Sequence, residues 1–219
     1  MSESSTSNTR VKLLDAAERL FALNGIGSTS LRAITSEAGT NLASIHYHFG
    51  KKEALVEAVF ARRIEPVNRD RLERLDRVEA ESEPNLEDVI RAFVRPALSL
   101  LRSPDHGGAH VMNLMGRLYS EPGDLKFAIL KQFEKIALRF GAALHRALPI
   151  LPPDELFWRF HFMIGSMAFT LVAGDVIEHR SEGRISLDDV DANVERLVSF
   201  IAGGLRAPLP NFTTSEDTV

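Results

Sequence analysis

The chain contains no cysteine among its 219 residues. This absence excludes a disulfide framework, a cysteine-based zinc site and a thiol nucleophile. The first ten residues, MSESSTSNTR, have no apolar core, so we expect no signal peptide. The most apolar segment, 156–173, is interrupted by Arg159 and His161 and is short for a membrane span, which needs about 20 residues. We therefore expect a cytoplasmic protein that does not enter a membrane.

Motifs of catalysis and of cofactor binding are also missing. The sequence has no phosphate-binding loop, no nucleophile elbow and no carboxylate–histidine motif of the helical-bundle metalloenzymes. His106 with His110, and Asp175 with His179, are four residues apart, but a metal site needs more converging ligands than either pair supplies. We predict no enzymatic activity, no cofactor and no metal site.

The charge of the chain is low and unevenly distributed. A net charge of −4 excludes a broad basic surface that would coat nucleic acid. Residues 1–63 carry eight lysines or arginines and six acids, which gives +2 and leaves −6 for the remainder. This division suits a small head that makes a few placed phosphate contacts and is joined to an acidic body.

Apolar residues recur at helical spacing along most of the chain, whereas no strand pattern or internal repeat stands out. We predict an all-α fold, in which Pro66 and Pro96 kink or interrupt the helices that contain them. The predicted helices span residues 9–24, 31–38, 42–49, 51–78, 86–102, 109–120, 125–148, 154–179 and 187–205.

Residues 29–55, TSLRAITSEAGTNLASIHYHFGKKEAL, have the pattern of a helix-turn-helix. A short helix ends at Gly39, a tight turn follows, and a second short helix begins at Leu42. The second helix of such a motif can lie in the major groove of duplex DNA.

The second helix has one face suited to reading DNA. At about 100° per residue, Ile45, Phe49 and Leu42 share the buried side, with Leu42 at the edge of the exposed face, and Ala43, Ser44 and Tyr47 lie on or beside the exposed side. A small side chain lets the backbone approach base edges, a serine can hydrogen-bond a base or phosphate, and a tyrosine can reach a phosphate. The alternative is that the tyrosine and the neighbouring histidines are ordinary surface or half-buried aromatic residues.

Cations and caps next to this helix add candidate phosphate contacts. Arg32 lies in the first turn of the preceding helix, whose N-terminus Thr29 and Ser30 can cap. Lys51 and Lys52 open the following helix, where the helix dipole disfavours positive charge and an external anion would favour it. The alternative is that these three cations are simply solvated. The full set of predicted DNA contacts is Thr29, Ser30, Arg32, Asn41, Leu42, Ala43, Ser44, His46, Tyr47, His48, Lys51 and Lys52.

This block resembles the TetR-type (tetracycline-repressor-like) family of transcriptional regulators. The residues that carry the resemblance are Thr29, Ile34, Ala38, Gly39, Ile45, Tyr47, His48, Phe49, Lys52, Glu53 and Leu55. The match covers about residues 9–60; His46 stands where the family usually has tyrosine, and Lys51 where it has serine. The resemblance implies an all-α dimer with a three-helix DNA-binding head and a larger ligand-sensing helical body.

Four segments follow from the helical pattern and the resemblance together. We expect a disordered tail over residues 1–8 and a helix-turn-helix DNA-binding domain over 9–60. A ligand-binding and dimerisation domain over 61–206 and a frayed tail over 207–219 complete the chain.

Two segments near the C-terminus, 156–173 and 194–205, carry our prediction of a homodimer. The first is apolar nearly all round, so it must be covered on more than one side. Small residues in both segments permit close helix approach, and groove-reading motifs usually act in symmetric pairs. The alternative is burial within one subunit. The predicted interface residues are Phe162, Gly165, Ser166, Phe169, Val194, Leu197, Ile201 and Leu205.

The body is rich in phenylalanine and methionine, which pack adaptably and can line a ligand pocket. The alternative for each residue is simple core packing. We expect a small, mainly apolar effector, such as an acyl chain or an aromatic compound; the run NLASIHYHFGKKEAL resembles a subgroup of the family that favours acyl ligands. The candidate pocket residues are Phe93, Met112, Met115, Phe127, Leu130, Phe133, Phe162 and Met163.

These features together predict a ligand-responsive repressor. Two heads of a homodimer would enter successive major grooves of a pseudo-palindromic operator in double-stranded DNA, and the effector would release them. The alternative is a helical-bundle ligand carrier or enzyme with a vestigial helix-turn-helix, which would have no specific DNA target.

Overall fold

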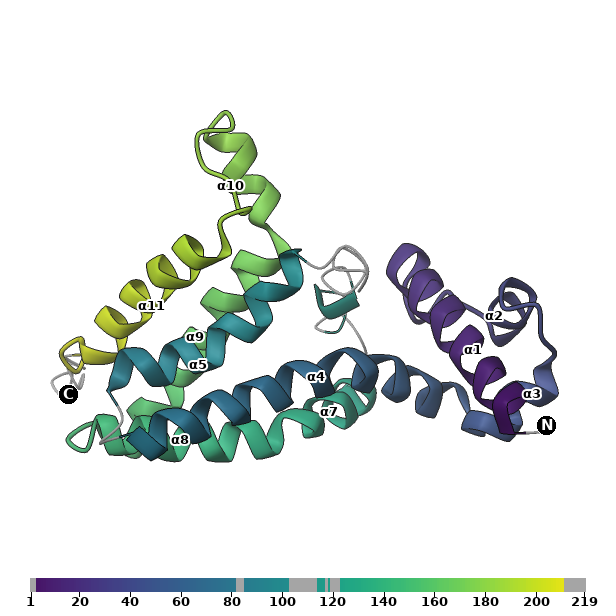
Figure 1. Ribbon diagram of the computed structural model, residues 1–219, viewed down its shortest axis with the longest axis horizontal. Helices are drawn as coiled ribbons and strands as arrows, with labels where there is room; N and C mark the ends of the chain where they lie inside the picture. Colours follow the sequence, from purple (N-terminus) through teal and green to yellow (C-terminus); the bar gives the residue numbers. More distant parts are fainter. Residues whose placement is uncertain (1–2, 82–84, 103–113, 117, 119–122, 211–219) are drawn as a thin grey trace, which may run out of the picture.

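The computed structural model describes residues 3–81, 85–102, 114–116, 118 and 123–210 (Figure 1). Within these residues the chain forms helices and no strand, which confirms the all-α prediction. The first helix begins earlier than expected: α1 spans Glu3–Asn24, so part of the segment predicted as a disordered tail is helical.

A small head contains α1, α2 (Leu31–Glu37) and α3 (Leu42–Phe49). Apolar residues one helical turn apart place one face of α1 inside, where Phe21 meets Ile34 of α2 and Ile45 of α3 in one fully buried cluster. Gly39, with a φ of 62°, lies in the turn between α2 and α3 and adopts a left-handed conformation that favours glycine.

The long helix α4 (Lys52–Glu81) leads from the head along the body, with α7 (Gly123–Leu130) and α8 (Glu134–Ala147) beside it (Figure 1). Pro66 lies inside α4, which continues past it as one helix. The head core also continues along α4: Ile64, Leu118 and Ile129 belong to the same buried cluster as Phe21. Head and body therefore share packed side chains.

The rest of the body is built from α5 (Leu86–Leu98), α9 (Pro153–Val172), α10 (Gly174–Arg180) and α11 (Val190–Arg206). Helices α5, α8, α9 and α11 surround a second apolar core. A short 3₁₀ helix, Ser99–Arg102, follows α5, and a second one, Lys131–Phe133, precedes α8.

The segment 154–179, predicted as one helix, is broken into α9 and α10, which meet at a bend of 65°. Gly174 is buried at this bend, and a Cβ atom there would lie only 1.8 Å from Leu187 Cδ1. A larger residue at this position would therefore require the Leu187 side chain to move. In the described part of the chain no single helix has the length and apolar character of a membrane span; α9 and α10 meet that criterion only as a bent pair.

Arg159, the buried charge within the apolar helix α9, has a structural role. Its guanidinium donates hydrogen bonds to the carbonyl oxygens of Gly204, Leu205, Ala207 and Pro208 at the end of α11. The last carbonyls of a helix lack partners within it, so this arginine caps α11 and ties it to α9.

Candidate functional site

Helix α3 is held at both ends by local hydrogen bonds. Asn41 Oδ1 accepts from the backbone N–H of Ser44 at 3.0 Å and from the Ser44 hydroxyl at 3.2 Å, so Asn41 is the N-cap. Gly50, with a φ of 72°, ends the helix, and His46 Nδ1 lies 2.9 Å from its carbonyl oxygen. Three of the predicted contact residues thus also fix the shape of α3.

The outer face of α3 is the one that helical spacing predicts. Ile45 is fully buried and Phe49 half-buried, whereas Ala43 is exposed and Tyr47 is 78% exposed. Leu42 differs from the prediction: spacing places it on the buried side, but at the N-terminus of this short helix it is exposed. The short helix therefore presents small and aromatic groups to solvent on a rigid support.

His48 and Ser44 lie at the edge of this face and are half-buried. The His48 ring meets the Tyr47 ring edge-on at a centroid distance of 5.0 Å. This contact limits the directions in which the tyrosine can point, which favours a defined position for its hydroxyl group.

The structure corrects the prediction for Thr29. Its side chain is only 3% exposed, and its hydroxyl donates to the carbonyl oxygens of Gly25 at 2.7 Å and Leu20 at 3.2 Å. Thr29 therefore fixes the turn before α2 and is not available to DNA. Ser30, which is exposed, is the N-cap and accepts from the Ala33 N–H at 3.1 Å.

Lys52 also has a role that the sequence did not indicate. Its ammonium donates to the carbonyl oxygen of Ile26 at 2.6 Å and lies 3.4 Å from that of Gly27. The helix dipole disfavours a lysine at this place, but internal carbonyl oxygens, rather than an external anion, compensate for it. Lys51 and Arg32 are exposed, as expected for phosphate contacts.

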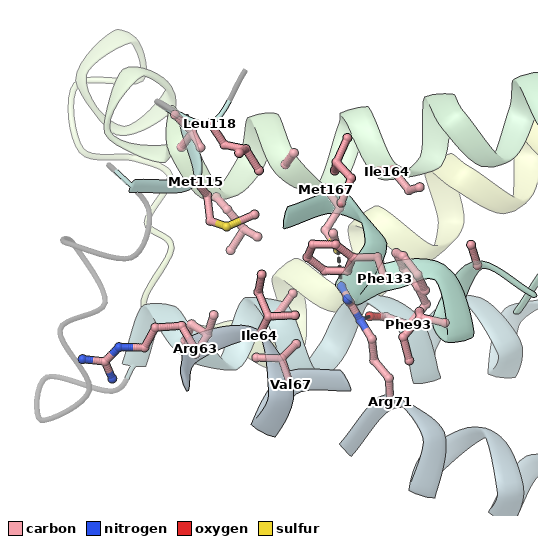
Figure 2. A pocket seen from close by; sticks show the side chains of 18 of the residues that line it. Arg63, Ile64, Val67, Arg71, Phe93, Met115, Leu118, Phe133, Ile164 and Met167 are labelled. Atoms are coloured by element: carbon pink, nitrogen blue, oxygen red, sulfur yellow. Dashed lines mark hydrogen bonds between the residues drawn. The ribbon is translucent and has the colours of Figure 1, made fainter. Parts of the chain in front are cut away.

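A cavity of about 190 Å³ lies in the body between α4, α5, α8 and α9 (Figure 2). Four of the predicted pocket residues line it: Phe93, Met115, Leu130 and Phe133. The lining also includes Ile64, Val67, Phe160, Ile164 and Met167, which we did not predict.

The other pocket predictions are placed differently. Phe127 and Phe162 are exposed and do not line the cavity, and Met163 is buried in the core without lining it. Met112 lies outside the described residues. An apolar side chain can pack inward or outward on a helix, and composition alone did not separate the two.

Arg71 is the functional candidate that sequence analysis missed. It lines the cavity and is 3% exposed, and burial lowers the pKa of its guanidinium to about 10. The signal was present in the sequence, because Ile64, Val67 and Arg71 fall on one face of α4 and an arginine on an apolar face is unexpected.

Two descriptions of known protein families match parts of the chain. Residues 91–204 match the profile described as "Tetracyclin repressor-like, C-terminal domain", and residues 13–59 match "Bacterial regulatory proteins, tetR family". The first match alone spans more than half of the chain. The chain belongs to the tetracycline-repressor-like family. Its members are transcriptional regulators, and the helix-turn-helix of residues 31–49 lies within the N-terminal match.

Curated relatives match this family member over short stretches. The nicotine-responsive transcriptional repressor HdnoR of Paenarthrobacter nicotinovorans is 44% identical over 57 residues, which cover 26% of this chain and 29% of the relative. The regulator LmrA of Bacillus subtilis is 44% identical over 54 residues, 24% of this chain and 29% of its own length. The matches thus span less than a third of each relative.

Solved structures show that the whole fold is shared at low identity. FadR of Bacillus halodurans, a fatty acid degradation regulator, superposes with a TM-score of 0.67 at 14% identity, covering 91% of this chain and 97% of its own. FadR of Bacillus subtilis in complex with stearoyl-CoA gives 0.65 at 16% identity and covers 89% and 98%.

One buried ion pair connects the cavity to the head of this tetracycline-repressor-like protein. Arg63, which lines the cavity, donates from Nε to Glu18 of α1 at 2.9 Å and 3.0 Å. Both side chains are largely buried. This bidentate pair joins α1 to α4 at the end of the cavity nearest the head.

The outer face of α9 carries the exposed part of the predicted dimer interface. Phe162 is 60% exposed, and Phe157, Trp158 and Phe169 are also exposed on this helix. Phe200 adds to them from α11, which packs beside α9 (Figure 1). Apolar groups this large seldom gather on a free surface.

The α11 part of that prediction is wrong. Val194, Leu197, Ile201 and Leu205 are buried in the core of their own subunit, where α11 packs against α5. The face of α11 that remains open holds Ser199, Phe200 and Gly203.

Proposed function

We propose that this protein is a homodimeric, operator-binding repressor of transcription that a small, mainly apolar effector releases from DNA. The observation that carries the proposal is the outer face of α3, where Ala43 and Tyr47 are exposed on a helix anchored by the buried Ile45. The proposal keeps the division into a head over residues 9–60 and a body over 61–206. Because bacterial DNA lies in the cytoplasm, this function places the protein there.

The exposed face of α3 suits the major groove of duplex DNA. Ala43 and Leu42 can contact a thymine methyl group, and the Tyr47 hydroxyl can reach a phosphate. Arg32 and Lys51 are exposed beside this face and supply positive charge for the DNA backbone. Lys52 and Thr29 support the head from within and make no contact in this proposal.

Dimerisation would bring two such heads to one side of the duplex. The exposed aromatic residues of α9 and the open face of α11, with its small Gly203, allow two copies to pack as a four-helix interface. Two heads related by a two-fold axis would read half-sites about 34–36 Å apart.

The cavity is the proposed effector site. Its lining is almost entirely apolar, which favours an acyl or aromatic ligand. The stearoyl-CoA complex of the Bacillus subtilis FadR, which shares the fold, is consistent with an acyl ligand in a body of this architecture.

The path from effector to head is short. Helix α4 lines the cavity with Ile64, Val67 and Arg71, and its first turns pack in the head core. A ligand that widens the cavity would move α4, and the Arg63–Glu18 pair would carry this movement to α1. A coupling free energy of about 1–3 kcal/mol is typical for such switches.

The test is a gel-shift assay with the DNA upstream of the protein's own gene, followed by footprinting of the shifted complex. We expect specific retardation and two protected half-sites about one helical turn apart. Ligand binding by a protein that retards this DNA no better than unrelated DNA of equal length would instead support the carrier or enzyme alternative.

A further inference from the structure

The cavity wall contains a buried positive charge without a negative partner. Arg71 donates from Nε to the Phe93 carbonyl oxygen at 2.9 Å and from Nη1 to Asn68 Oδ1 at 3.1 Å. Its carbon Cζ lies 4.2 Å from the centre of the Phe93 ring. Among the described residues, no carboxylate forms an ion pair with it. Isolated buried charges are costly, so an arginine kept in this place calls for an explanation.

No acidic residue lines the cavity in the described part of the chain. The other charged residue in the wall, Arg63, is already paired with Glu18, and its side chain points away from the interior in Figure 2. Arg71 is directed inward, with its guanidinium among Phe93, Phe133 and Met167. The cavity is therefore apolar with a single uncompensated cation.

The guanidinium of Arg71 has donors to spare. Arginine carries five N–H groups, and the two oxygen acceptors use only two of them. A third contact, from Nη2 to Met167 Sδ at 3.4 Å, uses a thioether, which is a weak acceptor. The terminal nitrogens can thus serve a better acceptor inside the cavity without breaking the bonds that orient the side chain.

We propose that Arg71 binds the carboxylate of a monoanionic amphiphile whose apolar tail fills the cavity. The proposal rests on the effector site proposed above and specifies its ligand as a free carboxylic acid. One carboxylate neutralises one guanidinium and offers two oxygens to the remaining N–H groups. A phosphate monoester would leave a second negative charge buried without a partner. A volume of about 190 Å³ lies below the usual range for ligand pockets, about 300–1,000 Å³, so the tail is of medium length.

The charge needed for this contact is present at neutral pH. Burial lowers the pKa of Arg71 to about 10, which still leaves the guanidinium protonated at pH 7.5. A bound carboxylate would favour the charged form further.

The experiment is isothermal titration calorimetry of the full chain at pH 7.5, without DNA. The probes are hexanoate, octanoate and decanoate, together with octanol, methyl octanoate and octyl phosphate. We expect one of the acids to bind at least about 10-fold more tightly than the alcohol, ester and phosphate. A hydrogen bond between charged groups typically strengthens binding by about this factor or more. Equal binding of octanoate and octanol, or no binding of any acid, would overturn the proposal.

Two variants connect this preference to Arg71. Arg71→Met replaces the charge by an apolar chain of similar length, and we expect it to lose the preference for the acid while keeping affinity for octanol. Arg71→Lys keeps the charge, and should bind the acid more tightly than Arg71→Met does. An Arg71→Met variant that binds the acid like the wild type would contradict the assignment.

Failure of the ligand proposal can be distinguished from misfolding of the variant and from failure of the operator-binding proposal. Thermal unfolding without ligand shows whether Arg71→Met remains folded, because the substitution removes a costly buried charge but also the hydrogen bonds to Phe93 and Asn68. If that variant fails to fold, the comparison of acid, alcohol and ester on the wild type still decides the proposal. Because the titration contains no DNA, failure to bind acids leaves the gel-shift result unaffected.

Discussion

Lys51 and Lys52 are neighbours in the sequence, but their ammonium groups have different surroundings. Lys52 reaches back to the carbonyl oxygens of the turn before α2, whereas Lys51 is exposed next to the outer face of α3. The same side-chain chemistry therefore stabilises the head in one position and is available to DNA in the other.

Replacing each lysine by methionine should separate these two roles. Lys52→Met should lower the free energy of unfolding by about 1 kcal/mol, because carbonyl oxygens lose a charged donor. Lys51→Met should leave stability unchanged and reduce the slope of log K against log salt by about 1, the effect of one lost phosphate contact. Urea denaturation measures the change in stability, and salt-dependent DNA titrations measure the change in slope. A loss of stability in Lys51→Met, or a lower salt slope in Lys52→Met alone, would contradict the roles given to the two lysines.

At the scale of elements, the contact between α1 and α4 combines a buried and an exposed ion pair. Glu18 meets Arg63 where both side chains are largely buried, and Asp15 meets Arg62 where both are partly exposed. The two pairs join the same two helices and make a matched comparison.

Glu18→Gln should destabilise the protein by about 3 kcal/mol, because it leaves a mostly buried guanidinium without its counter-charge. Asp15→Asn, the matched control, should cost less than about 1 kcal/mol because solvent screens an exposed pair. Urea denaturation tests both values. In the folded Glu18→Gln protein we also expect effector binding to persist while its effect on DNA affinity decreases; an unchanged effect would remove this pair from the coupling path.

The ion pairs between α5 and α11 predict that the stability of the fold decreases at acid pH. Hydrogen bonds from Arg206 and Arg91 lower the pKa values of Glu87 and Glu195 below the ordinary value of 4.5. A carboxylate with a lowered pKa stabilises the fold above 4.5, and its contribution is lost as the pH falls through the folded-state value. The Glu195 side chain is exposed and that of Glu87 is half-buried at the surface, so solvent screening keeps each contribution below about 1 kcal/mol.

The double variant Glu87→Gln, Glu195→Gln tests this dependence by urea denaturation between pH 7 and pH 3. It should be less stable than the wild type at pH 7, and the difference should shrink as the pH falls below about 4.5. A difference that stays constant or grows towards acid pH would exclude these two groups as its source.

At the scale of the whole molecule, the exposed aromatic face of α9 is the expected contact between subunits. Phe162→Glu would place a charge in this apolar interface, and we expect it to shift the protein from dimer to monomer and to weaken operator binding. Phe127→Glu is the control, since Phe127 is also exposed but lies on α7. Analytical ultracentrifugation distinguishes the outcomes; a monomeric wild type, or a Phe162→Glu variant that remains dimeric, would contradict the interface.

The helical periodicity and the helix-turn-helix spacing were sufficient to predict the fold class and the outer face of α3. They were not sufficient for α11, where Val194, Leu197, Ile201 and Leu205 form one apolar stripe that fits either its own core or a partner. Nor did they predict the break at Gly174, where the Leu187 side chain packs closely against the backbone. Periodicity identifies a buried face but not the element that covers it.

The central proposal is that the outer face of α3 reads DNA, and Tyr47→Ala tests it most directly. Fluorescence anisotropy would compare the affinity of the wild type, Tyr47→Ala and the control Phe127→Ala for the footprinted operator and for a scrambled duplex. We predict that Tyr47→Ala loses about 10-fold or more in operator affinity, with an unchanged melting temperature and dimer content, while Phe127→Ala binds like the wild type. Equal operator affinity of Tyr47→Ala and the wild type, or equal affinity of the wild type for operator and scrambled DNA, would contradict the account.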